Sequence, residues 1–197
     1  MSAGRLREFD KEAALESAMT LFWRDGYSGT SMSDLTAAMG INKPSLYSAF
    51  GNKEALFISS LNQFVEKHGV PHARYLLTPN QSLRQRLELY LKSIADMASD
   101  TSLPGGCFIT LSSCEARSHC LPDDALQEIS KIMSVNVKTL TDFFSHELQN
   151  DNLVTETTPE VLANYLLTLQ NGLTVMARSG VKRNILYKVI DQSVTLF

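Results

Sequence analysis

The chain has 197 residues, of which 44% are hydrophobic and 20% are charged, and its formal net charge is -3 at pH 7. This composition suits a folded globular protein and excludes both a disordered chain and a strongly basic nucleic-acid coat. No apolar run reaches the roughly 18 to 20 residues that span a bilayer, the N-terminus lacks an apolar signal core, and the cysteine count is 3. We therefore expect a cytoplasmic protein with free thiols and no membrane partner.

Helical periodicity runs through the whole chain. Apolar residues recur at three- and four-residue spacing and no segment alternates as a strand does, so we predict an all-α fold. Asp10 supplies an N-cap for the first predicted helix, and Gly26 suits the left-handed residue after its end. Ser31 and Asp34 form a capping box for a short second helix, which ends at Gly40.

A third short helix is predicted between Asn42 and Gly51. Pro44 falls in its first turn, where a missing N–H costs nothing. Asn52 then caps a longer helix predicted over residues 53–67. Two short helices joined by a turn containing glycine form a helix-turn-helix signature, in which the second helix enters the DNA major groove.

The exposed side of this third helix is predicted to carry groove and phosphate contacts. Hydroxyls, a cation and a phenol suit that chemistry, and they are supplied by Lys43, Ser45, Tyr47 and Ser48. Lys53, at the start of the next helix, is placed to hold a phosphate. Arg5 and Arg7 precede the first helix and are either an arm on the DNA backbone or minor groove or a solubilising tail. Spacing alone also allows a helical protein that does not bind DNA.

Residues 9–57 contain three diagnostic segments, LFWRDGYSGTS, LTAAMGI and KPSLYSAFGNKEALF. In these segments the chain resembles the DNA-binding domain of the TetR/AcrR family of transcriptional repressors. The resemblance implies a homodimer that binds double-stranded operator DNA, and it adds Thr30, Ser31 and Ser33 to the expected DNA contacts. Ala49 stands where many members have a larger polar residue, usually His. The remainder of the chain is similar to the family only in the number, length and order of its helices.

The expected division is a helix-turn-helix DNA-binding domain at residues 1–52 and a ligand-binding and dimerisation domain at 53–197, with helix 53–67 connecting them. HGVPH, at 68–72, is interpreted as a break before the second region. Short polar or proline-bearing breakers predict an antiparallel helical bundle there, with helices over 81–99, 105–118, 123–150, 159–179 and 183–196.

A ligand pocket in the bundle is expected to be lined by apolar side chains on inward helix faces, although any core needs the same residues. They are Tyr90, Ile94, Met97, Cys107, Phe108, Leu111, Cys114, Met133, Val137, Leu140, Phe144 and Tyr165. Because few polar groups stand among them, we expect a hydrophobic or aromatic ligand of modest size.

All three cysteines lie between residues 103 and 120. Cys107, Cys114, His119 and Cys120 lack the paired spacing of a structural zinc site, so no metal is expected. Cys107 near a helix N-terminus could be a thiol that reacts with oxidants or electrophiles, since the helix dipole favours a thiolate. The alternative, which we favour, is a small apolar core residue.

The last two predicted helices are apolar over more than one face. Such a wide stripe suits a helix that packs in its own bundle and against a partner, and the resemblance favours a dimer interface over a simple core. The residues expected there are Leu162, Leu166, Leu169, Leu173, Met176, Leu186 and Ile190.

An enzyme is not expected, because the sequence has no glycine-rich phosphate loop, no nucleophile elbow and only scattered histidines. No cofactor is expected either. We predict a repressor that binds a pseudo-palindromic operator as a homodimer and is released by a small hydrophobic, aromatic or thiol-reactive inducer. The alternative is a helical protein-interaction adaptor, which would show no salt-dependent affinity for duplex DNA.

Overall fold

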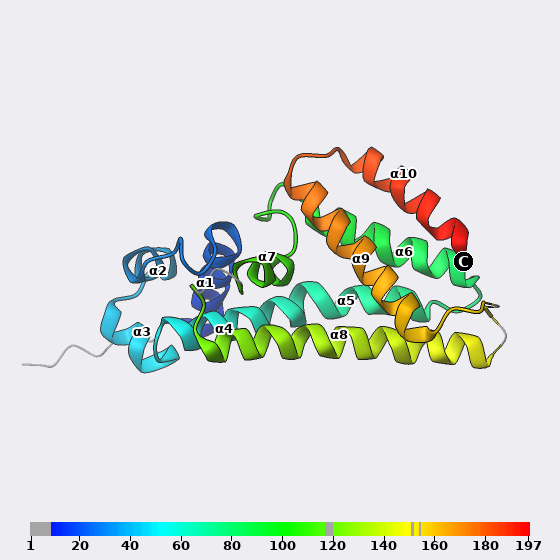
Figure 1. The fold of residues 1–197 in the computed structure, drawn as a ribbon. Coiled ribbons are helices and arrows are strands. Elements are labelled where there is room, and N and C mark those ends of the chain that lie inside the picture. The colour runs from blue at the N-terminus through cyan, green and yellow to red at the C-terminus, as the bar shows by residue number, and fades with distance from the viewer. Residues whose placement is uncertain (1–8, 117–119, 151, 154) are drawn as a thin grey trace, which may run out of the picture.

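The computed structural model describes residues 9–116, 120–150, 152–153 and 155–197, and all regular elements in these ranges are helices (Figure 1). The α-helices are α1 (Lys11–Asp25), α2 (Met32–Met39), α3 (Lys43–Phe50), α4 (Lys53–Phe64), α5 (Val70–Ala73), α6 (Leu83–Ala98), α7 (Phe108–Glu115), α8 (Asp123–Gln149), α9 (Pro159–Arg178) and α10 (Arg183–Ser193). The predicted all-α class is confirmed. Within the described part of the chain, no helix is both long and apolar enough to cross a membrane.

The first helices begin at the predicted caps. The Asp10 carboxylate accepts hydrogen bonds from two backbone N–H groups of the first turn of α1. Ser31 and Asp34 form the reciprocal capping box of α2. Asn42 accepts from the backbone of α3 at 2.9 Å, and Asn52 from the backbone of α4 at 2.8 Å. Each cap satisfies N–H groups that a helix start leaves without partners, so these boundaries follow from local sequence.

The predicted break at 68–72 is wrong. After α4 the helical path continues through a π-helical turn (Val65–Gly69), α5 and a 3-10 turn (Arg74–Leu77). Pro71 falls in the first turn of α5, where its missing N–H is tolerated. His68 and His72 consequently lie one turn apart on a continuous helical path rather than in a loop.

Two apolar cores hold the molecule together. The first joins α1 to α4 with the start of α7 and the start of α8, and aromatic rings cross its centre. Phe57 meets Phe22 and Phe108 edge to face at centroid distances of 5.1 and 5.6 Å, and Trp23 meets Phe64 at 4.8 Å. The second core joins α6, α9, α10 and the later part of α8. Figure 1 shows α2 and α3 near one end, α10 near the other, and α8 running along the length between them.

The later helices match the predicted ranges to within a few residues, except that α7 is shorter. Gly105 and Gly106 have φ of 84° and 71°, a backbone region that favours glycine, so the helix begins only at Phe108. The last helix ends at Ser193 and is followed by a 3-10 turn, Val194–Leu196.

Candidate DNA-binding helices and ligand cavity

Helices α2 and α3 form a pair with one buried and one exposed side. Leu35 of α2 and Leu46 of α3 are completely buried, and Phe50 is nearly so. Tyr47, the residue after Leu46 in α3, is 53% exposed although it is a large aromatic residue. The turn between the helices contains Gly40 at φ 65°, the left-handed conformation that ends α2.

The predicted DNA contacts fall into three groups. Ser31, Ser33, Lys43, Tyr47 and Ser48 are exposed, and Ser45 is half-buried. Arg5 and Arg7 lie outside the described residues. Thr30 departs from the prediction, because its side chain is only 2% exposed and its hydroxyl donates to the Gly26 carbonyl at 2.7 Å. Its hydroxyl therefore closes the turn after α1 instead of facing outward.

Lys53 is positioned by the aromatic ring of Tyr27. Its Nζ lies 4.1 Å from the ring centroid, a cation–π contact. Partial burial lowers the pKa of Lys53, and the Glu115 carboxylate acts in the opposite direction. The ammonium is thus held over the ring of Tyr27, in the turn that follows α1.

One group of hydrogen bonds, which we call the α1–α9 latch, ties α1 to the last turn of α9. The Arg178 guanidinium donates to the carbonyl oxygens of Arg24, Gly105 and Pro104, at 2.8, 3.1 and 3.3 Å. The Trp23 indole N–H donates to the same Gly105 carbonyl at 3.1 Å. Helices α1 and α9 are therefore joined through the Pro104–Gly105 loop.

A second connection runs from α7. The Glu115 carboxylate accepts from the backbone N–H of Tyr27 at 3.0 Å. It also fills the space beside Gly26, where an added Cβ would lie 2.5 Å from a carboxylate oxygen. This close approach, together with a φ of 76°, explains the need for glycine at the end of α1.

A cavity of about 480 Å³ lies among the segment from Phe64 to Leu76, α6, α7, α8 and α9. Of the twelve predicted ligand residues, seven line it: Tyr90, Ile94, Met97, Cys107, Met133, Val137 and Leu140. Its size falls within the roughly 300 to 1,000 Å³ typical of small-molecule sites. These seven residues line the cavity, and their contact with a ligand stays a prediction.

The other five predicted residues are not in the wall. Phe108 packs in the first core against Phe57 and Phe64, and Phe144 is buried in the second core. Cys114 is exposed, and Leu111 and Tyr165 lie outside the wall. Inward-facing helix positions are shared between cavity and core, and periodicity does not separate the two.

The cavity also has polar side chains that the prediction missed, so the expectation of few polar groups is wrong. They are His68, His72, Thr110, Asn136, Gln170, Asn171 and Thr174, with Ser113, Thr139, Asn164 and Thr168. The i, i+4 spacing of the two histidines was a usable signal, which the assumption of a break at 68–72 concealed.

Hydrogen bonds organise this polar side. The Tyr90 hydroxyl donates to Gln170 Oε1 at 2.8 Å, and the Thr110 hydroxyl donates to Asn171 Oδ1 at 3.0 Å. His72 Nδ1 lies 2.9 Å from the Ser93 hydroxyl oxygen. Burial lowers the pKa of His72 to about 4 and raises that of Tyr90, so both side chains are neutral at pH 7.

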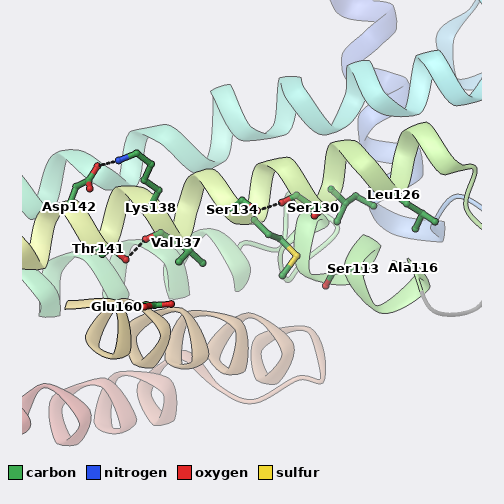
Figure 2. Close-up of a pocket in the computed structure, with 12 residues that line it drawn as sticks. Ser113, Ala116, Leu126, Ser130, Ser134, Val137, Lys138, Thr141, Asp142 and Glu160 are labelled. Atoms are coloured by element: carbon green, nitrogen blue, oxygen red, sulfur yellow. Dashed lines mark hydrogen bonds and ion pairs between the residues drawn. The ribbon is translucent and has the colours of Figure 1, made fainter. Parts of the chain in front are cut away.

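An open groove of about 820 Å³ runs along α8 beside the cavity (Figure 2). Figure 2 shows its wall formed by the α8 stretch from Leu126 to Asp142, with Glu160 of α9 opposite. Ser113, Met133 and Val137 line both the groove and the cavity, so the two spaces are adjacent. The groove is more open to solvent than the cavity, which makes the cavity the better candidate for a ligand.

The residues predicted for a dimer interface are mostly internal. Leu162, Leu166, Leu173, Leu186 and Ile190 are buried in the second core of the protomer, and Leu169 packs against it. Of the predicted set only Met176 is exposed. The exposed large apolar side chains on α9 and α10 are Val161, Val175, Met176, Ile185 and Val189. The wide stripe of these helices is therefore divided between core and surface.

The cysteines occupy different environments. Cys107 is buried at the N-cap of α7 and lines the cavity, whereas Cys114 and Cys120 are exposed. His119 lies outside the described residues. Among the described residues, no cluster of His, Cys, Asp and Glu could hold a metal ion.

Comparison with known proteins finds similarity to bacterial transcriptional regulators. Residues 14–59 match the model of bacterial regulatory proteins of the tetR family. The chain is 30% identical over 198 residues to the HTH-type transcriptional repressor ComR of Escherichia coli, covering 100% of this chain and 92% of ComR. It is also 30% identical over 178 residues to the repressor BdcR of the same organism, covering 90% of this chain and 83% of BdcR.

A solved structure extends the comparison to the fold. It is a cysteine mutant of the TetR family transcriptional regulator CifR complexed with 26-base-pair double-strand operator DNA. The TM-score is 0.86 at 29% identity, covering 98% of this chain and 100% of that chain. The similarity therefore spans both the helix pair and the bundle.

Proposed function

The chain belongs to the TetR family of bacterial regulatory proteins, and we propose that it is a homodimeric repressor that a small molecule in the cavity releases from operator DNA. Residues 1–52 would read the DNA, and residues 53–197 would bind the ligand and dimerise, with α4 connecting the two. The relatives carry the regulatory part of the proposal, since ComR and BdcR are named repressors.

The observation that supports DNA binding best is the outward polar side of α3. Leu35 and Leu46 fix the helix pair from within, which leaves Lys43, Tyr47 and Ser48 exposed on a two-turn helix. Such a helix is long enough to reach across one major groove. Lys53 would add a phosphate contact beside the N–H groups of α4.

Dimerisation would use the exposed sides of α9 and α10. Val175 and Met176 on α9 and Ile185 and Val189 on α10 give an apolar surface on adjacent helices. A two-fold axis through such a surface would bring the same helices of two chains together. Two copies of α3 would then enter successive major grooves of a pseudo-palindromic operator, about one helical turn apart.

Release would follow from ligand binding to one of two conformations. Helix α9 lines the cavity with Gln170, Asn171 and Thr174 and ends in the α1–α9 latch. A ligand that prefers one position of α9 would therefore bias the position of α1 and of the helix pair. The extent of release is set by the difference in affinity of the ligand for the two states.

Cys107 supports a second class of inducer. Its thiol is in the wall of the cavity at the start of α7. A thiol-reactive electrophile that enters the cavity would therefore meet Cys107 in the cavity wall. Covalent attachment there would hold α7 in a changed position, and the repressor would release DNA as with a reversible ligand.

The test is capture of genomic fragments by the purified protein, sequencing of the bound DNA, and titration of the enriched fragment at two salt concentrations. Enrichment of a palindrome near a promoter, with affinity that falls steeply with salt, is the expected result. Failure to enrich any fragment, before and after removal of bound small molecules, would favour the adaptor alternative.

A further inference from the structure

The part of the cavity wall that the structure describes carries no formal charge, since it contains no Asp, Glu, Lys or Arg. Burial lowers the pKa of His68 and His72 and raises that of Tyr90, so these three side chains are neutral at pH 7. A charged ligand would lose its hydration without gaining an ionic partner, and an unpaired charge is costly to bury.

The hydroxyl groups of the wall have their protons engaged within the protein. The Tyr90 hydroxyl donates to Gln170 Oε1, and the Thr110 hydroxyl donates to Asn171 Oδ1. Four others donate to backbone carbonyl oxygens at 2.7 to 3.0 Å, namely those of Ser113, Thr139, Thr168 and Thr174. A hydroxyl has a single proton, so among these hydroxyl and amide groups the donors left for a ligand are amide N–H groups.

The orientation of the Gln170 amide follows from Tyr90. The Tyr90 side chain is only 5% exposed, and within the described residues its hydroxyl proton has one acceptor, Gln170 Oε1, at 2.8 Å. If the amide were reversed, its N–H groups would face the hydroxyl and this buried proton would lose its acceptor, which is unfavourable. The oxygen of Gln170 is therefore turned toward Tyr90, and Nε2 lies on the other branch of the planar amide.

Nε2 of Gln170 is within reach of a ligand. It makes no hydrogen bond in the described part of the chain, and it is not among the buried side-chain atoms that lack a partner, so it retains accessible surface. Gln170 is half-buried and lines the cavity. The next residue of α9, Asn171, repeats the arrangement, because its oxygen accepts from Thr110 and its Nδ2 is likewise absent from the buried atoms. Helix α9 therefore contributes two amide donors to the wall.

We infer that the cavity binds an uncharged molecule with an apolar body and a carbonyl group, a ketone or an ester, whose oxygen accepts a hydrogen bond from Nε2 of Gln170. A carbonyl oxygen accepts hydrogen bonds and carries no proton that would need an acceptor in return. Apolar side chains such as Met97, Val137 and Leu167 would contact the body of the molecule. This inference specifies the inducer of the proposed repressor and rests on that function for its biological role.

Isothermal titration calorimetry on the full-length protein without DNA tests the assignment. The probes are 4-acetylbiphenyl, 4-isopropenylbiphenyl and biphenyl-4-carboxylate, which have one body and nearly one shape but end in a neutral acceptor, no acceptor and a negative charge. The native protein should bind the carboxylate more weakly than the ketone by about tenfold or more. Because the alkene is less well hydrated than the ketone, the hydrogen bond is measured by how the ratio of their affinities changes between variants.

Two variants link this ratio to Gln170. Gln170→Met keeps the length of the side chain and removes the amide. Because it also leaves the Tyr90 hydroxyl without its acceptor, the double variant Tyr90→Phe/Gln170→Met removes both partners. In the double variant the affinity of the ketone relative to the alkene should fall by about threefold to tenfold, the size of one hydrogen bond. Gln127→Met, at an exposed glutamine of α8 outside the cavity wall, is the matched control and should keep the native ratio.

Infrared spectroscopy of the bound ketone, with an isotope-labelled carbonyl group, gives an independent measurement. A hydrogen bond to the oxygen lowers the frequency of the C=O stretch, so the frequency should rise in the double variant and stay at its native value in Gln127→Met.

The assignment is overturned if the double variant keeps the native ratio or the native stretch frequency. It is also overturned if the carboxylate binds as tightly as the ketone, or if the native protein binds neither neutral probe. Failure of the regulatory function gives a different result. In that case the ketone binds with the expected dependence on Gln170, but operator affinity, measured by fluorescence anisotropy, does not change when it is added.

Discussion

The α1–α9 latch offers the sharpest test of the proposed coupling between the cavity and the DNA-binding helices. Arg178→Met keeps much of the aliphatic stem and removes the guanidinium, which bonds the Arg24 and Gly105 carbonyls at 2.8 and 3.1 Å. If the latch transmits ligand binding, the variant should bind operator but release it less completely when the cavity is filled.

The expected size follows from these bonds. Hydrogen bonds from charged groups contribute about 1.5 to 3 kcal/mol each, and Arg178 is exposed, so solvent screening favours the lower end or less. A total of about 1.5 kcal/mol corresponds to roughly a tenfold change in an equilibrium. This is also within the range of about 1 to 3 kcal/mol usual for coupling between two sites.

The assay compares operator affinity with and without a saturating concentration of 4-phenylphenol, a neutral aromatic probe for the cavity, by fluorescence anisotropy. The ratio of the two affinities should fall by up to about tenfold in Arg178→Met. Arg183→Met is the matched control, because Arg183 of α10 makes an ion pair with Asp96 at 3.2 Å and does not belong to the latch. If Arg178→Met loses stability but keeps the native ratio, the latch is structural and does not carry the coupling.

Three further predictions concern binding, reactivity and stability. Tyr47→Phe and Lys53→Ala should each weaken operator binding by about 1 kcal/mol in anisotropy titrations, while circular dichroism shows that both variants remain folded. Cys107→Ser should abolish any loss of operator binding caused by N-ethylmaleimide, because its thiol lines the cavity. Glu147→Gln should lower the free energy of unfolding by about 3 to 5 kcal/mol in urea, since the carboxylate is 3% exposed and its oxygens bond the Arg86 guanidinium at 2.5 and 2.9 Å.

The ion pair between Arg86 and Glu147 also makes the free energy of unfolding depend on pH, with stability lost at acid pH. The hydrogen bonds from Arg86 hold the pKa of Glu147 below its ordinary value. Its contribution to stability is therefore present above the pKa of an unfolded glutamate, about 4.3, and is lost as the pH falls through the lower folded-state value. Glu147→Gln should remove this part of the acid dependence.

Specific outcomes would contradict these predictions. Native operator affinity in both Tyr47→Phe and Lys53→Ala would mean that α3 and the start of α4 do not contact DNA. Tyr75→Phe is the control, because Tyr75 lies in the turn Arg74–Leu77 and not in α2 or α3. A Cys107→Ser protein that still responds to N-ethylmaleimide would assign the response to Cys114 or Cys120. A Glu147→Gln melt equal to the native one at neutral pH would show that the buried pair adds no net stability.

Helix starts were predictable because their determinants are local. Asp10, Ser31, Asn42 and Asn52 each cap the helix that immediately follows. A cap depends on residues two or three positions apart, so one sequence is enough to identify it. The π-helical turn after α4 was not predictable in this way, because glycine and proline at 69 and 71 indicate a break unless the surrounding packing holds the helical path.

The cavity was only partly predictable for a different reason. Tyr90 and Leu140 face inward by periodicity, and so does Phe144, which lies in the core. Whether an inward residue meets another side chain or empty space depends on the relative placement of five segments distant in sequence. The same limitation applies to α9, where Leu166 is internal and Met176 is exposed although both belong to one wide apolar stripe.

The cavity and the latch are joined by one short loop, which explains how a small ligand could act on α1. An added Cβ at Gly106 would lie 3.2 Å from both the Thr174 carbonyl oxygen and the Arg178 Cβ, so the loop is fixed directly against the last turns of α9. The next residue, Cys107, is in the cavity wall, and the preceding one, Gly105, accepts the hydrogen bond of Trp23. Because close-packed contacts of this kind shift together rather than deform gradually, we expect a ligand that displaces the wall at Cys107 or Thr174 to displace the carbonyl that holds α1 as well.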